Sequence, residues 1–180
     1  MVSSGEAHIG ICSSIEGASD ELITLPCHKL ERCIICAPHH PLLRKTRISL
    51  ADVARYPLVL QTATYSGGWQ IKRAFEVRGI KLNIVSSIAD PEVAKACVEQ
   101  GIGITVLPTR VFDPKRDRGI RAIHASHLFE PMKSYVVLHQ NYYLRGYTSD
   151  FIEMFAPKWP RGAIQEAMRT AAAPTSTGAR

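Results

Sequence analysis

The sequence of 180 residues contains no apolar stretch long enough to cross a membrane. A spanning helix needs about 20 consecutive apolar residues, and every apolar run in this chain is much shorter. The first residues, MVSSGEAHIGICSS, have neither the basic start nor the long apolar core of a secretory signal. We therefore expect a cytoplasmic protein that makes no contact with a membrane.

A dense cluster of positive charge is also missing, although the net charge is +6. The lysines and arginines are spread from Lys29 to Arg180, and no segment has the pattern of a helix-turn-helix. We expect this charge to form a solvated surface that attracts anions. Any binding of these 180 residues to DNA is expected to be weak, independent of sequence and sensitive to salt.

Cysteine occurs five times, an odd number that does not suggest a disulfide framework. Cys33-Ile34-Ile35-Cys36 has the spacing of a redox pair, but such a pair needs a helix N-terminus to stabilise its thiolate. The residues around it are typical of a strand, in which side chains three positions apart point to opposite faces. The pattern therefore predicts buried, reduced cysteines with a structural role.

Other sequence motifs that could suggest catalysis or metal binding lack the flanking structure or the partner residues that those functions need. Gly101-Ile102-Gly103 follows a predicted helix and precedes a strand, the reverse of a dinucleotide loop. Tyr65-Ser66-Gly67 lacks the preceding glycine of a hydrolase elbow. The histidines have no carboxylate at a metal-ligand spacing and are expected on the surface or in turns: His39, His40, His124, His127 and His139. We expect no catalytic residue, no metal site and no cofactor.

Short apolar runs alternate with segments of helical periodicity. Strands are predicted for HIGIC (8–12), ELITLP (21–26), ERCIICAP (31–38), PLVLQ (57–61), LNIVSSI (82–88), ITVLP (104–108) and SYVVLHQ (134–140). Helices are predicted near 49–56, 67–78, 90–100 and 144–155, the last with one apolar face of Leu144, Tyr147, Phe151, Ile152 and Phe155. This alternation predicts an α/β fold whose sheet is mostly parallel and covered by helices on both sides.

Several helix ends carry specific signals. Ser49 and Asp52 form a capping-box pattern, and Asp90 precedes a proline as an N-cap does. Gly79 and Gly101 are placed to terminate helices.

Ser66-Gly67-Gly68 combines a hydroxyl with two glycines at the start of a predicted helix. Free N–H groups at a helix start favour sulfate, phosphate or carboxylate when no side chain blocks their approach. From this motif alone, an N-cap is the simpler interpretation of Ser66. Ser13 and Ser14 end the first predicted strand, where α/β sheets often bind ligands.

Four segments, in order, resemble the effector-binding domain of LysR-type regulators: GEAHIGI, LITLPCHKLERCIICAPHHPL, SLADVARYPLVLQT and VAKACVEQGIGITVLP. LPCHKLER, the turn from Thr62 to Ser66, and LRGYTSDFIEMFAP resemble the CysB-like subfamily in particular. The resemblance extends over residues 5–169. It implies a periplasmic-binding-protein-like (type II) fold, with two α/β subdomains and a ligand cleft between them.

The resemblance also implies a division of the chain. Residues 1–13 and 104–169 are expected to form an incomplete subdomain I, residues 14–103 subdomain II, and residues 170–180 a disordered tail. The family's N-terminal helix-turn-helix has no counterpart in these 180 residues, so promoter DNA is expected as a partner only through that absent segment. An incomplete sheet would expose apolar edges, which favours a homo-oligomer.

The CysB-like pattern implies that a sulfate-type anion is held partly by two hydroxyls, which fall on Ser13 and Ser66. Gly67 and Gly68 would add their N–H groups. The resemblance thus favours a ligand-sensing domain for sulfate or a small sulfur-pathway metabolite. A solute-binding protein of a transport system with the same fold is the alternative, and a thiol-dependent hydrolase using Cys12 or Cys36 stays open because the sequence does not exclude an exposed thiol.

Overall fold

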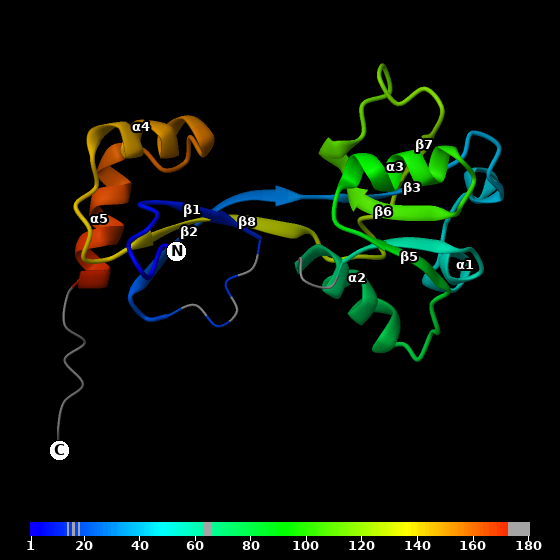
Figure 1. The fold of residues 1–180 in the computed structure, drawn as a ribbon, viewed down its shortest axis with the longest axis horizontal. Coiled ribbons are helices and arrows are strands. Elements are labelled where there is room, and N and C mark those ends of the chain that lie inside the picture. Colours follow the sequence, from blue (N-terminus) through cyan, green and yellow to red (C-terminus); the bar gives the residue numbers. More distant parts are fainter. Residues whose placement is uncertain (14, 16, 18, 63–65, 173–180) are drawn as a thin grey trace. The chain divides into compact units, whose positions relative to one another are not determined.

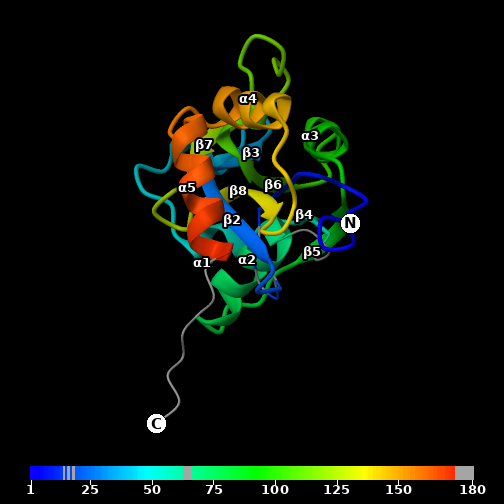
Figure 2. The same cartoon turned by 90° about the vertical axis from the view of Figure 1, so that its left-hand side faces the viewer.

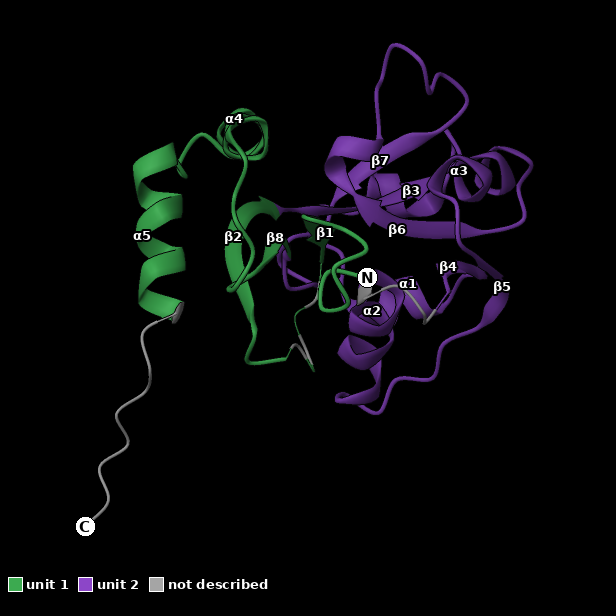
Figure 3. Cartoon of the chain, turned by 60° about the vertical axis from the view of Figure 1, so that its left-hand side comes forward, with its two compact units in different colours: residues 1–29, 133–180 green, residues 30–132 purple. Residues whose placement is uncertain are grey.

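The computed structural model describes residues 1–13, 15, 17, 19–62 and 66–172 (Figure 1). The chain forms two compact units (Figure 3). Unit 1 combines residues 1–29 with residues 133–180, and unit 2 consists of residues 30–132. No helix of the described part has the length and apolar character that a bilayer span requires.

Unit 2 contains a five-stranded sheet in the order β5-β4-β6-β3-β7. Its strands are β3 (Arg32–Cys36), β4 (Leu58–Gln61), β5 (Ile84–Ile88), β6 (Ile104–Pro108) and β7 (Arg121–His124). β4 is parallel to β5 and β6, but β3 is antiparallel to both β6 and β7. The prediction of a mostly parallel sheet is therefore wrong. Only the stretch from β4 to β6 has the strand-helix-strand connections that make neighbours parallel.

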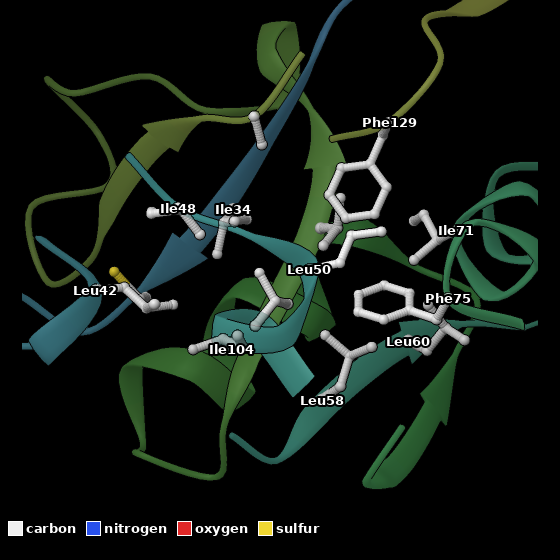
Figure 4. Packing of buried hydrophobic residues seen from close by; sticks show 14 residues of the cluster. Ile34, Leu42, Ile48, Leu50, Leu58, Leu60, Ile71, Phe75, Ile104 and Phe129 are labelled. Atoms are coloured by element: carbon white, nitrogen blue, oxygen red, sulfur yellow. The ribbon is translucent and has the colours of Figure 1, made fainter. Parts of the chain in front are cut away.

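Helices cover both faces of this sheet. One face packs against η1 (Pro41–Arg44), α1 (Leu50–Ala54) and α2 (Ser66–Glu76). Figure 4 shows this core, in which the rings of Phe75 and Phe129 lie 5.9 Å apart between centroids. The opposite face packs against α3 (Pro91–Glu99), which contributes Val98, and η2 (Thr109–Val111) follows β6.

The predicted helix ends are confirmed. The Ser49 hydroxyl accepts a bond from the Asp52 N–H at 3.2 Å, and the Asp52 carboxylate accepts from the Ser49 N–H at 3.0 Å. Asp90 caps α3 by accepting from the N–H groups of its first turn. Gly79 and Gly101 have φ angles of 65° and 76°, the left-handed conformation that follows many helices.

Unit 1 has a three-stranded sheet in the order β1-β8-β2. Its strands are β1 (Gly10–Cys12), β2 (Leu22–Leu30) and β8 (Met132–His139), and its helices are α4 (Gly146–Phe155) and α5 (Arg161–Ala172). Figure 2 shows α5 in front of β2 and β8. Ile152 of α4 and Ile164 of α5 are fully buried against side chains of these two strands.

Three predictions for unit 1 need correction. Tyr147 and Phe151 are 60% and 41% exposed, because α4 shares the sheet with α5 and buries only a narrow stripe around Ile152. α5 extends to Ala172, so residues 170–172 are helical, while residues 173–180 lie outside the described part. His139 is buried in β8 instead of lying on the surface.

The two units also differ in their bounds from the predicted subdomains. Residues 104–132 belong to unit 2, because β6 pairs with β3 and β4, and β7 pairs with β3. The described residues among 14–29 belong to unit 1, since β2 joins the sheet of β8.

The two cysteines of β3 lie on opposite faces of the sheet, as predicted. Cys36 packs in the core with α1 and α2, whereas Cys33 packs on the side of α3. Both thiols are free and buried, and burial raises the pKa of each to about 11. The geometry confirms a structural role and opposes a redox pair.

We expect Cys33→Ser and Cys36→Ser each to lower the free energy of unfolding by about 1–3 kcal/mol, because each buries a hydroxyl in apolar surroundings. Urea denaturation measures the loss. The half-buried Cys97 supplies the control, since Cys97→Ser should cost less. Rapid labelling of both β3 thiols in the native protein by an aromatic disulfide would contradict their burial.

Candidate functional site

The N-terminus of α2 lies very close to the end of β4. A Cβ atom on Gly68 would lie 2.2 Å from the carbonyl oxygen of Gln61 and 3.0 Å from that of Thr62. A Cβ atom on Gly67 would lie 2.8 Å from Oε1 of Gln61. Both glycines are buried, and at position 68 the obstacle is backbone, which cannot swing aside. The glycine pair therefore allows the helix start to pack directly on the strand end.

Arg32, the first residue of β3, places its guanidinium beside this helix start. The residue is only 1% exposed. Its Nε donates to the carbonyl oxygen of Glu130 at 3.3 Å, and its Nη2 donates to Oε1 of Gln70 in α2 at 2.7 Å. Nη1 is buried, has no hydrogen-bond partner among the described residues, and lies 3.9 Å from the Cβ position built on Gly67.

The electrostatics of this region favour an anion. Burial lowers the pKa of Arg32 to about 10, and no carboxylate of the described residues offsets that effect. The guanidinium nevertheless stays charged at neutral pH, and a buried charge without a counter-ion is costly. The N-terminus of α2 adds partial positive charge of the same sign. The arrangement thus combines an unused donor, a buried cation and a helix start.

The predicted site residues are divided between the two units. Gly67 and Gly68 lie beside Arg32 in unit 2, and the backbone of Ser66 begins α2, although its side chain lies outside the described part. Ser13 follows β1 in unit 1 and is half-buried, and Ser14 is not described. The meeting of Ser13 and Ser66 around one ligand stays a prediction.

A surface cavity of about 310 Å³ elsewhere in unit 2 is also basic, and Lys45, Arg47, His124 and His127 line part of it. Most of these side chains have protein partners. Lys45 pairs with Asp52 at 2.6 Å, and His127 bonds the carbonyl oxygen of Ile48 at 2.8 Å. The described residues contain no group of histidine, cysteine or carboxylate side chains that could hold a metal ion. The region around Arg32 is therefore the stronger candidate site.

Comparison with known proteins agrees with the fold. The LysR substrate binding domain model matches residues 1–160. The HTH-type transcriptional regulator CysB of Burkholderia cenocepacia is 34% identical over 169 residues, which cover 94% of this chain and 54% of the relative. The HTH-type transcriptional regulator SsuR of the same organism is 32% identical over 171 residues, which cover 95% and 56%. The chain thus spans about half the length of these curated relatives.

Among solved structures, the cofactor-binding domain of the Cbl transcriptional regulator matches with a TM-score of 0.85 at 24% identity, covering 93% of this chain and 73% of that one. This likeness confirms the α/β, periplasmic-binding-protein-like (type II) fold. Together with the family match over residues 1–160, it shows that the chain belongs to the LysR substrate binding domain family and resembles the CysB-like members.

Proposed function

We propose that this chain is the ligand-sensing domain of a LysR-type transcription regulator of sulfur assimilation. Membership of the LysR substrate binding domain family carries the proposal. Two curated relatives are regulators named CysB and SsuR. In the whole protein, promoter DNA would be bound by a helix-turn-helix in a cytoplasmic homo-oligomer.

A binding role is favoured over catalysis. The thiol of Cys36, a candidate nucleophile from the sequence, is buried and has a raised pKa, which disfavours the reactive thiolate. The ligand we propose is sulfate or a small sulfur-pathway metabolite with an anionic group. Gly67 and Gly68, with the hydroxyl of Ser66, would hold it in unit 2, and Ser13 would contribute from unit 1.

The hydroxyl of Ser66 provides the direct test of the site. We expect Ser66→Ala to weaken sulfate binding by about 1–2 kcal/mol, the value of one hydrogen bond to a charged group, with little change in the melting temperature of the free protein. Titration calorimetry measures the affinity. Ser87→Ala on the exposed side of β5 is the matched control and should bind as the wild type does. Equal affinity in Ser66→Ala and wild type would remove Ser66 from the site.

The regulator itself has a separate test. The coding sequence upstream of these residues should encode an in-frame helix-turn-helix. A secretory signal there would instead support a transport-type solute-binding protein and would overturn the proposal.

A further inference from the structure

We propose that Arg32 is the charge partner of the ligand, its Nη1 donating to an oxygen of an oxyanion held at the N-terminus of α2, so that the site selects fully negative ligands. This inference rests on the proposed ligand-sensing function and names the ligand class. The sequence motif at Ser66-Gly67-Gly68 does not contain this arginine, which enters the region from β3.

The first observation is how the guanidinium is held. A guanidinium has five N–H donors in one plane. The bonds from Nε to Glu130, between β7 and β8, and from Nη2 to Gln70 of α2 fix that plane from two different segments of the chain. Neither N–H group of Nη1 has a hydrogen-bond partner in the described part of the chain, and Nη1 is buried beside Gly67, where an unused charged donor is unfavourable. An oxygen atom of a bound anion would satisfy them.

The second observation is the sign of the charge. Arg32 is buried at the end of α2 that already carries partial positive charge, and no ion pair joins its guanidinium to a carboxylate of the described residues. A neutral ligand would leave the cation without a counter-ion. A zwitterion would bring a second cation into the same region. An oxyanion such as sulfate or a sulfonate offsets both the charge of the guanidinium and the partial positive charge of the helix N-terminus. The site should therefore select ligands by their charge as well as by their shape.

The experiment compares three probes at constant ionic strength on the full 180-residue chain. The probes are sulfate, methanesulfonate and dimethyl sulfone, which share a tetrahedral sulfur and carry two, one and no negative charges. We expect sulfate to raise the melting temperature of the wild type most, methanesulfonate less, and dimethyl sulfone not at all.

The variant Arg32→Met removes the donor and the buried charge while keeping an apolar side chain of similar length. We expect it to weaken sulfate binding about 10- to 100-fold, as the loss of a charge-assisted bond does. Its melting temperature without ligand should stay close to that of the wild type, because the removal of an uncompensated buried charge opposes the loss of the hydrogen bonds to Glu130 and Gln70. Arg118→Met, at an exposed arginine of the same unit, is the control and should keep the wild-type affinity.

The outcomes separate this inference from the proposed function. Equal sulfate affinity in Arg32→Met and wild type overturns the role of Arg32 and leaves the regulator proposal intact. A wild type that responds to dimethyl sulfone as strongly as to sulfate, or to no anion, also overturns it. Charge-selective binding that depends on Arg32, together with an upstream secretory signal, would support the site and reject the regulator. If Arg32→Met does not fold, Arg32→Lys becomes the test variant. It keeps the charge but loses the planar donor, so it should still weaken sulfate binding.

Discussion

Gly68→Ala is expected to destabilise unit 2 by about 1–3 kcal/mol and to reduce sulfate binding more than 10-fold. The added methyl group would lie 2.2 Å from the carbonyl oxygen of Gln61, so α2 must move away from β4. Alanine is the better helix former by about 1 kcal/mol, but this gain is smaller than the cost of separating two backbone segments. The same movement shifts the helix start relative to Arg32, which is why binding should fall along with stability.

Urea denaturation and sulfate titration of Gly68→Ala measure the two effects. Gly162→Ala in α5 is the matched control, because a Cβ atom there meets nothing within 4 Å. That variant should be as stable as the wild type or slightly more stable. A Gly68→Ala protein with wild-type stability would show that the junction between α2 and β4 is looser than the structure has it.

Phe75→Ala is expected to lower the free energy of unfolding by about 3–5 kcal/mol, the largest loss among the substitutions considered. Phe75 is fully buried near the C-terminal end of α2 and packs against Phe129 in the largest core of unit 2. Truncation leaves a cavity that rigid strands on the other side cannot fill. Since α2 also carries the glycine pair, ligand binding should weaken as the helix loosens.

Chemical denaturation checks this loss as well. Val93→Ala on α3 is the control, because Val93 is 50% exposed and its truncation leaves no cavity. The difference between the two variants should be at least about 2 kcal/mol. Similar losses in both would mean that the Phe75 side chain is not packed as the structure describes.

Local signals in the sequence are sufficient to predict the helices and strands from β4 to β6 in unit 2. Strand β4, helices α2 and α3 and strands β5 and β6 follow from apolar periodicity, the Asp90 cap and the glycines after the helices. The reversed direction of β3 and the existence of β7 were not predictable in this way. Both depend on pairing between distant segments, and the residues of β7, RAIH, alternate too briefly to be recognised as a strand.

The residues of the candidate site also differ in whether local sequence signals could predict them. Gly67 and Gly68 were predictable because small residues at a helix start leave the backbone N–H groups open to an anion, which is visible in the local sequence. Arg32 was not identified. An arginine before an apolar strand usually marks an exposed strand end, and its burial depends on Gln70 and Glu130, which lie far along the chain. The one available signal was the charge itself, directly before the fully buried residues Cys33 to Cys36.

The position of β3 inside its sheet, between β6 and β7, has a consequence for the order of folding. Cys33 lies beside Leu107 of β6, 74 positions later in the sequence, and β7 follows β6. During synthesis this strand of cysteines and isoleucines leaves the ribosome long before either neighbour exists, with both hydrogen-bonding edges open. Such distant pairing slows folding and leaves an apolar strand available to other chains. We therefore expect nascent chains that end before β6 to aggregate more readily than the complete chain.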